Sequence, residues 1–179
     1  MGVFNIRVYG ILINERKDVL VTDEFRFGKQ MNKFPGGGLN WGEGTIDCLK
    51  REFREELGCE IEVIKHFYTT DFFQPSAFHA DHQLISIYYI VKNTTPFSPP
   101  LKGESAQSPF SPPGLTAIRQ PDRVILAGTG DLGHNDKTEG AQSFRWLPVS
   151  ELNAKEFTFP IDKKVVVMLY NPPQSNKTI

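Results

Sequence analysis

The sequence predicts a mixed α/β protein built around a single hydrophobic core. Segments rich in β-branched and aromatic residues alternate with segments of helical periodicity along the chain. The chain has 179 residues, of which 39% are hydrophobic and 12% aromatic, so it can fill one sizeable core. Strands interleaved with helices around one core are typical of the mixed α/β class. We therefore expect residues 1–179 to form one domain.

The first part of the chain predicts two strands followed by a loop. Residues 4–13, FNIRVYGILI, have the composition of a strand, and VLVT at 19–22 resumes it after the polar stretch NERKD. This spacing predicts a β-hairpin. Residues 23–44 are expected to be loop-like, with a glycine cluster at 36–38. The amino terminus lacks a basic segment and a long apolar run, which favours a first strand over a signal peptide.

Residues 45–57 predict an amphipathic helix. At ~100° per residue its apolar positions fall in one narrow stripe. The stripe consists of Ile46, Leu49, Phe53 and Leu57. Gly58 follows where a left-handed carboxyl-terminal cap is expected.

The later elements are predicted from composition in the same way. Strands are expected at 60–73, 83–92, 123–128 and 143–148. A last helix is expected within 157–171, because Pro160 suits a first helical turn. The tail after Pro172 is expected to be mobile.

Residues 93–121 differ in composition from the rest of the chain. They contain seven of the thirteen prolines, and the sequence PFSPP occurs at 96–100 and again at 109–113. A repeat this short is not a solenoid, so we interpret the segment as a Pro/Ser-rich loop inserted between strands. A polyproline II ligand for a partner is the alternative.

Charge and cysteine content exclude several classes of protein. The net charge is −1, from 20 basic and 21 acidic residues, so no overall field draws the protein to nucleic acid or anionic lipid. The two cysteines, Cys48 and Cys59, form neither a zinc motif nor a disulfide framework, which favours a cytoplasmic location. No apolar stretch reaches the ~18–20 residues that a membrane helix needs.

The predicted helix carries three carboxylates close together. In REFREELG, residues 51–58, Glu52 and Glu56 are one turn apart and Glu55 adjoins them. A solvated acidic face is one interpretation, supported by the i,i+4 series Asp47–Arg51–Glu55. A bound divalent cation is the other, because hard cations prefer carboxylate oxygens. The helix alone does not decide between them.

The glycine-rich segment before the helix favours the metal. The stretch FPGGGLNWGEG lets backbone approach a ligand closely, but Glu43 stands where a phosphate-binding P-loop needs lysine. From Gly37 to Cys59 the chain resembles the Nudix box, GX5EX7REUXEEXGU, where U is a bulky aliphatic residue. Every fixed letter matches, and the departures are Phe53 and Cys59 at U positions. FNIRVYGILI and SFRWLPVSEL resemble strands found elsewhere in this family.

The resemblance implies a fold, a reaction and a set of site residues. It implies an α/β/α sandwich with a mixed sheet, in which the box forms a loop–helix–loop. It implies hydrolysis of a nucleoside diphosphate linked to another moiety, with Mg²⁺ or Mn²⁺. The implied metal ligands are Glu52, Glu55, Glu56 and the Gly36 carbonyl. Arg51 would orient Glu52 or its neighbours, and Glu43 would brace the loop. Gly37 and Gly58 would have structural roles in the motif.

The general base and the substrate are less closely defined. Glu52 is one candidate base, and Glu139 in a downstream loop is another, unless it is only a solvated charge. Pro75, sixteen residues after Cys59, matches a family marker for ADP-ribose, but the glycine and acidic residue that usually follow are lacking. A nucleotide sugar and a (d)NTP therefore stay open. Arg7, Arg26 and Lys33 are candidate phosphate contacts, and the candidate base-stacking residues are Phe25, Phe27, Phe34 and Trp41.

Two other functions compete with the hydrolase. A Nudix-fold sensor of a nucleotide or ADP-ribose would bind without cleaving, but such proteins usually lose box glutamates, and all are present here. A scaffold would rest on the PFSPP repeats alone. We expect a small-molecule substrate, neither a nucleic acid polymer nor a membrane as partner, and leave a homodimer open.

Overall fold

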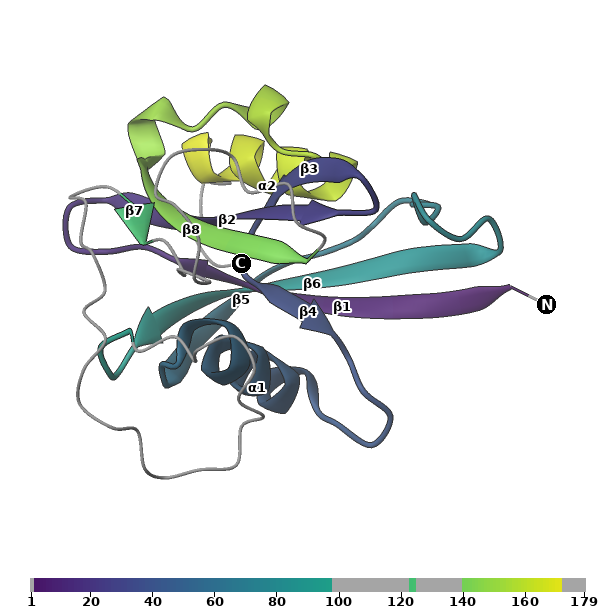
Figure 1. The fold of residues 1–179 in the computed structure, drawn as a ribbon, viewed down its shortest axis with the longest axis horizontal. Helices are drawn as coiled ribbons and strands as arrows, with labels where there is room; N and C mark the ends of the chain where they lie inside the picture. Colours follow the sequence, from purple (N-terminus) through teal and green to yellow (C-terminus); the bar gives the residue numbers. More distant parts are fainter. Residues whose placement is uncertain (1, 98–122, 125–139, 172–179) are drawn as a thin grey trace, which may run out of the picture.

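Two β-sheets lie between two helices, as the sequence predicted for the fold class (Figure 1). The computed structural model describes residues 2–97, 123–124 and 140–171. The strands are β1 (Val3–Leu12), β2 (Asp18–Arg26), β3 (Lys29–Lys33), β4 (Gly36–Gly38), β5 (Ile61–Thr69), β6 (His82–Asn93), β7 (Arg123–Val124) and β8 (Ala141–Pro148). The helices are α1 (Thr45–Leu57) and α2 (Pro160–Tyr170), with short 3₁₀ turns at Val149–Glu151 and Ala154–Glu156.

The first sheet is mixed and the second is antiparallel. The first has the order β4-β1-β6-β5, and β1 runs parallel to β6 from Val3 opposite His82 to Leu12 opposite Val91. The second has the order β3-β2-β8-β7. The glycine strand β4 pairs with β1 on the side away from β6, so it lies at the edge of the first sheet.

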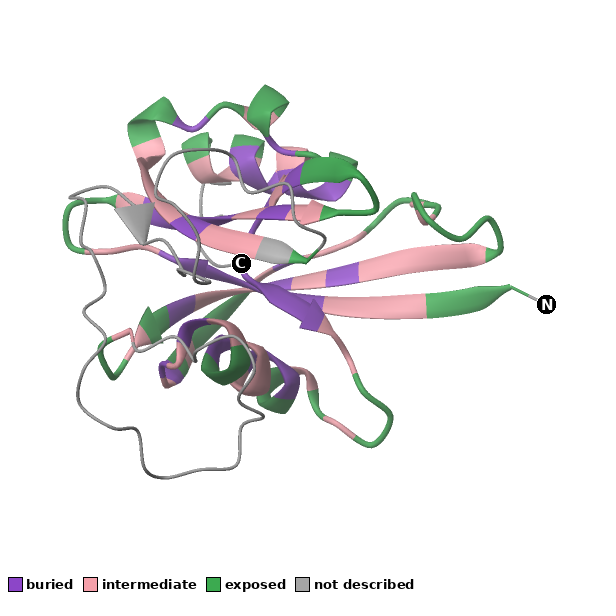
Figure 2. Cartoon of the chain, viewed as in Figure 1, coloured by how far each residue is buried: buried purple, intermediate pink, exposed green. Residues whose placement is uncertain are grey.

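Side-chain alternation along the central strands creates two apolar clusters. On β1, Tyr9 and Ile11 belong to the cluster that includes α2, whereas Val8 and Leu12 belong to the cluster that includes α1. This follows from the two-residue period of a strand. Figure 2 shows the buried residues gathered where the strands cross between the helices, while the amino-terminal end of β1 is exposed.

Helix α1 begins and ends where the sequence predicted. Gly58 adopts the left-handed conformation (φ 59°), and its N–H donates to the Arg54 carbonyl at 3.0 Å. The predicted stripe was wrong at Ile46, which is exposed; Cys48 is buried instead. Ile46 lies in the first turn and belongs to neither apolar cluster, so its apolar character is not used for packing there.

Two predictions for residues 4–44 were wrong. The expected hairpin does not form, because β1 and β2 belong to different sheets and meet at one bridge, Ile13–Val19. Residues 23–44 are not simply a loop: β2 continues to Arg26, and β3 and β4 follow. The polar β3 forms because it pairs with β2, and β4 forms because it pairs with β1, so tertiary pairing overrides weak local propensity.

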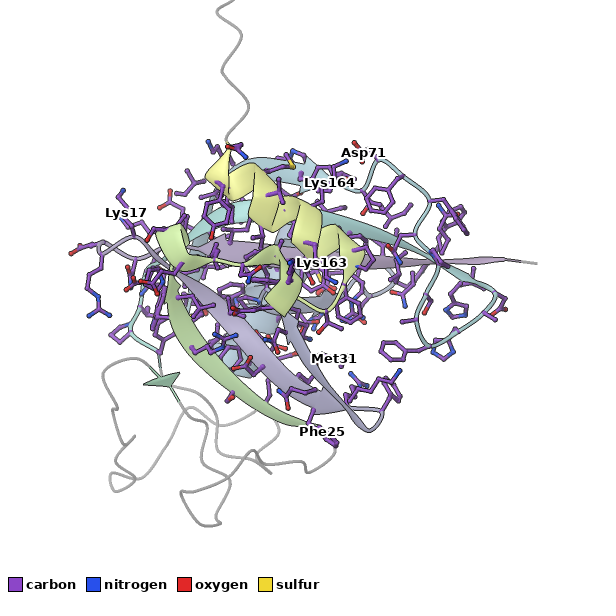
Figure 3. All side chains as sticks on the ribbon, turned by 90° about the horizontal axis from the view of Figure 1, so that it is seen from above. Lys17, Phe25, Met31, Asp71, Lys163 and Lys164 are labelled. Carbon is purple, nitrogen blue, oxygen red and sulfur yellow. The ribbon has the colours of Figure 1, made fainter. Side chains whose placement is uncertain are left out.

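Later boundaries agree with the sequence in part. Strand β5 ends at Thr69 rather than 73, and helix α2 starts at Pro160 in its first turn, as predicted. Viewed from above in Figure 3, α2 crosses over the strands, and Lys164 lies beside Asp71. Lys164 Nζ and Asp71 Oδ1 are 2.5 Å apart, which ties the loop after β5 to α2.

Several predictions fall outside the described residues. The structure describes the proposed 93–121 insertion only to residue 97, the 123–128 strand only at Arg123–Val124, and the tail only to residue 171. Among the helices described, none is long and apolar enough to span a membrane.

Replacing Gly10 by alanine is expected to destabilise the fold by ~1–3 kcal/mol, because it overpacks the core. A Cβ at Gly10 would lie 2.6 Å from two ring carbons of Phe53, and Phe53 is fully buried, so the ring cannot easily move. Thermal unfolding measures the effect. Gly38→Ala is the control, since nothing lies within 4 Å of its added Cβ. Equal melting temperatures for the two variants would show that β1 and α1 do not pack this closely.

Candidate active site

Arg51 holds the loop before α1 against the helix. Its Nε and Nη2 donate to the two Glu43 carboxylate oxygens at 2.8 and 3.0 Å, and Nη2 also reaches the Gly38 carbonyl at 3.1 Å. Nη1 donates to Glu52 at 2.8 Å and to Glu55 at 3.1 Å. The guanidinium therefore orients the loop and two helix carboxylates at once. It pairs with Glu55, as the i,i+4 series predicted.

Glu43 braces the glycine loop as the family resemblance led us to expect. Besides accepting from Arg51, its Oε2 accepts from the Asn40 N–H at 3.0 Å. The Arg51 hydrogen bonds lower the pKa of Glu43 to about 2. The carboxylate is thus ionised throughout the neutral range.

We expect the Glu43–Arg51 pair to make stability depend on acid pH. The pKa of Glu43 is depressed on folding, so its contribution is present above the ordinary value of about 4.5 and is lost as pH falls towards 2. Melting temperatures of the wild type and Glu43→Gln should differ most near neutral pH and converge between pH 5 and 2. A difference that stays constant over that window would contradict the pairing.

Gly37 leaves the space that the Glu52 carboxylate occupies. A Cβ at Gly37 would lie 2.3 Å from the Glu52 Cδ and Oε1, so a larger residue would force this carboxylate out of its position. The Glu52 side chain is only 14% exposed. The glycine is therefore required so that this carboxylate can sit between helix and loop.

Glu56 is held by the loop and by β8. Its Oε2 accepts from the Gly36 N–H at 3.3 Å, and Oε1 accepts from Gln142 Nε2 at 2.9 Å. Burial raises the pKa of Glu56, although Lys33 and the two hydrogen bonds act in the opposite direction. Gly36 thus lies beside Glu56; the family resemblance implies that both are metal ligands.

A cavity of about 170 Å³ is lined by both basic and acidic side chains, the acidic ones being Glu24 and Asp162. The predicted phosphate contacts Arg7, Arg26 and Lys33 all line it. Lys33 Nζ is 2.7 Å from Glu24 Oε2, and Arg7 Nε donates to the Tyr9 hydroxyl at 2.7 Å. Burial acts to lower the pKa of Lys33, but Glu56, Tyr9 and Glu24 outweigh it and the pKa is raised. Tyr9 contributes most to the raised pKa of Arg7, and Glu52 also contributes.

Aromatic side chains also line the cavity. Phe27 and Phe78 lie with ring centroids 4.5 Å apart, and Phe78 and Phe159 lie 6.5 Å apart. All three line the cavity. Phe27 was among the predicted stacking residues, whereas Phe25 does not line this space.

Two other predicted stacking residues lie elsewhere. Phe34 does not line the cavity; its side chain is fully buried and packs against Tyr88 and Phe157. Trp41 is fully exposed on the loop before α1, so it does not pack beneath that loop either. Sequence could not separate these cases, because aromatic residues fill cores as readily as they line pockets.

The comparison with family models decides the classification. The model described as the NUDIX domain matches residues 3–169. This chain belongs to the Nudix family. The match spans nearly the whole chain, so the Nudix hydrolase class that the box predicted is confirmed.

Solved structures agree with the Nudix fold. The E. coli ORF135 protein has a TM-score of 0.60 at 13% identity, covering 98% of this chain and 96% of that one. The MutT protein from Methanosarcina mazei Go1 has a TM-score of 0.60 at 12% identity, covering 95% of each chain. The NUDIX hydrolase from Nitrosomonas europaea has a TM-score of 0.58 at 14% identity, covering 93% and 88%. At these identities the likeness concerns the fold alone.

One curated relative matches a shorter part of this Nudix chain. The RNA pyrophosphohydrolase of Orientia tsutsugamushi (strain Boryong) is 30% identical over 61 residues, which is 34% of this chain. The match spans only 38% of that relative's length.

The donor chemistry of the Nudix box fits a divalent metal. The candidates are carboxylate oxygens, which hard cations prefer, and Gly37 leaves room for one of them. The carboxylates are engaged by Arg51, Gly36 and Gln142, and in the described ranges no three acidic, histidine or cysteine side chains converge as a metal site. The ligand assignment of Glu52, Glu55 and Glu56 therefore stays a prediction.

The structure adds residues that the sequence did not indicate. Gln142 holds Glu56, Glu24 pairs with Lys33, and Tyr88 donates to a buried Asp162. Ordinary strand and helix patterns surround all of them, so no local signal distinguishes them. Glu139, the alternative general base, lies outside the described residues.

Proposed function

We propose that this Nudix chain is a metal-dependent hydrolase that cleaves the pyrophosphate linkage of a nucleoside diphosphate derivative. ADP-ribose, a nucleotide sugar and a (d)NTP are the candidate substrates. A cytoplasmic location and a single domain stay predictions from the sequence, and a homodimer stays open.

One observation carries the proposal: two carboxylates of α1 interact electrostatically with basic side chains that line the cavity. Arg7 interacts electrostatically with Glu52, and Lys33 interacts with Glu56, so α1 and the cavity are coupled. A pyrophosphate is polyanionic and is repelled by carboxylates alone. Basic side chains and a divalent cation together make the same place favourable for it.

Within this arrangement each side chain has a distinct task. Arg51 holds Glu52 in one orientation through its 2.8 Å hydrogen bond, so that Glu52 can accept a proton from an attacking water. Arg7 and Lys33 offset the charge of the phosphates. Gln142 and the Gly36 N–H keep Glu56 in place.

We propose Glu52, Glu55, Glu56 and the Gly36 carbonyl as the groups that would hold Mg²⁺ or Mn²⁺. When bound, such an ion neutralises phosphate charge and makes a bound water more acidic. Glu139 is retained as the alternative base.

The aromatic part of the cavity suits a nucleobase. Bases stack on aromatic rings with a gain of ~1–3 kcal/mol each, and Phe27 and Phe78 are exposed at the cavity rim. The phosphates of a nucleotide placed there would lie within the same cavity as Arg7, Arg26 and Lys33.

A substrate panel tests the proposal. Phosphate and nucleoside monophosphate release would be measured with Mg²⁺ and with Mn²⁺, each with an EDTA control. The panel contains ADP-ribose, nucleotide sugars, normal and oxidised dNTPs and dinucleoside polyphosphates. A short 5′-triphosphate RNA is added because one relative is named an RNA pyrophosphohydrolase. Metal-dependent cleavage of one class is expected; tight binding of a ligand without any cleavage would instead identify a sensor.

A further inference from the structure

Arg7 differs from Arg26 and Lys33, the other two basic side chains of the cavity, in having no carboxylate partner. Lys33 Nζ lies 2.7 Å from Glu24 Oε2, and Arg26 Nη1 lies 3.7 Å from Glu24 Oε1. Among the residues that the structure describes, none forms an ion pair with Arg7. The positive charge of Arg7 is therefore the least compensated of the three.

Tyr9 fixes the Arg7 guanidinium to the sheet. The two residues lie on the same face of β1, because side chains two positions apart along a strand point the same way. Arg7 Nε donates to the Tyr9 hydroxyl at 2.7 Å, and the guanidinium carbon lies 5.8 Å from the Tyr9 ring centroid. Tyr9 itself is only 4% exposed and stacks on Tyr88, with ring centroids 5.2 Å apart. A ring packed in this way is rigid, so it fixes the position of Arg7.

The two terminal nitrogens of Arg7 are available to a ligand. Within the described part of the chain, Nη1 and Nη2 donate no hydrogen bond. Neither nitrogen is buried, and Arg7 lines the cavity. A guanidinium whose Nε is occupied still presents Nη1 and Nη2 as a planar fork, and this fork matches two oxygens of one phosphate.

We propose that Tyr9 is a positioning residue, which holds the Arg7 guanidinium so that Nη1 and Nη2 bind one phosphate group of the substrate together. The inference rests on the proposed function, because it assumes that a nucleotide occupies the cavity. Arg7 also interacts electrostatically with Glu52, so a phosphate held by Arg7 lies within electrostatic reach of the α1 carboxylates.

A double-mutant cycle on ligand binding tests the inference without requiring turnover. The probes are the α,β-methylene analogues of ADP, GDP, CDP and UDP, in which a carbon bridge replaces the pyrophosphate oxygen and prevents its hydrolysis. Calorimetry would measure the dissociation constant of each analogue with Mg²⁺ present. Four bases are used because the preferred base is not assumed.

The expected result is that the two substitutions are not additive. Arg7→Gln should weaken binding of the tightest analogue ~10–100-fold, as expected for the loss of hydrogen bonds between charged groups. Tyr9→Phe keeps the stacked ring and should weaken binding ~3–10-fold, as expected for coupled residues in contact. In the Arg7→Gln background, Tyr9→Phe should change binding by less than about twofold, because Tyr9 acts only through Arg7.

Tyr68→Phe is the matched control. Tyr68 belongs to the same apolar cluster as Tyr9 and donates its hydroxyl hydrogen to Asp71, but it does not line the cavity. Its loss of one hydroxyl should leave binding within about twofold of the wild type. Thermal unfolding establishes that each variant is folded. Should Arg7→Gln fail to fold, Arg7→Met, which keeps an unbranched apolar stem, takes its place in the cycle.

The outcomes are distinguishable from those of the substrate panel. Unchanged binding in Tyr9→Phe, an equal effect of Tyr9→Phe with and without Arg7, or no binding of any of the four analogues would overturn the inference. Cleavage of a panel substrate together with additive effects would leave the hydrolase proposal standing and remove the role of Tyr9. Non-additive effects without any cleavage would support the role of Tyr9 in a protein that binds diphosphates but does not hydrolyse them.

Discussion

Replacing Glu56 by glutamine is expected to reduce kcat by more than ~100-fold. Substituting a residue that only supports a metal ligand typically lowers activity ~10–100-fold, and loss of a ligand itself should cost more. Glu56 is the carboxylate most firmly held at the site, between the Gly36 N–H and Gln142. Glutamine has the same shape but binds a divalent cation far less well than a carboxylate. The loss should therefore appear in turnover with saturating Mg²⁺ or Mn²⁺.

The fold should survive this change. Burial already disfavours the charged form of Glu56, so a neutral side chain of the same size costs little at that point. One hydrogen bond is lost or reversed, for ~1 kcal/mol, which corresponds to roughly 2–4 °C in melting temperature for a chain of this length. Calorimetry or circular dichroism would measure it.

The matched control is Glu62→Gln, which removes an exposed carboxylate on β5. Its kcat should equal that of the wild type. If Glu56→Gln also kept full activity with the substrate identified from the panel, Glu56 would not be a metal ligand.

Replacing Arg51 by glutamine should lower both stability and turnover. Glu43 and Glu52 would lose their main partner, and each is only 14% exposed. Removing one member of a buried ion pair lowers the free energy of unfolding by ~3–5 kcal/mol. Because Arg51 itself is 25% exposed, we expect a loss of about 2 kcal/mol, which corresponds to a fall of roughly 4–8 °C in melting temperature. Turnover should fall ~10–100-fold, because Glu52 is no longer oriented.

Arg54→Gln is the control for Arg51, since it lies on the same helix. Arg54 also pairs with a glutamate, Glu60, but both side chains are about half exposed. Such surface pairs contribute ~0–1 kcal/mol, so little change is expected in either measurement. If Arg51→Gln and Arg54→Gln had equal effects, the Arg51 network would not organise the site.

Arg51→Lys distinguishes charge from geometry. Lysine keeps the positive charge but cannot contact Glu43, Glu52 and the Gly38 carbonyl with a planar fork. We expect it to recover part of the lost stability and little of the lost turnover. Full recovery of turnover would mean that charge alone is sufficient.

The residues of the box could be predicted from sequence because they interact with one another within one short segment of the chain. Helix α1 and its glycine cap follow from the apolar period and from Gly58. Gly37, Glu43 and Arg51 have a recognisable spacing, because they act within one loop–helix unit. The structure then showed why the spacing exists: Gly37 makes room for Glu52, and Arg51 bonds Glu43.

The misassigned elements depended on partners distant in sequence. Strand β3 is polar and β4 is three glycines, so neither has strand propensity of its own, and each forms because another strand pairs with it. Phe34 could not be separated from Phe27 by sequence, because only packing decides that one is buried and the other lies at a cavity rim.

The sequence by itself therefore determined the family, helix α1 and the carboxylates on it, since those are encoded in one continuous stretch. Only the tertiary structure decided which side chains surround them. The parallel pairing of β1 with β6 brings Arg7 near Tyr88, β3 adds Lys33, and α2 adds Asp162. These residues are up to 155 positions apart, from 7 to 162, and a cavity between distant segments leaves no periodic signal in any one of them.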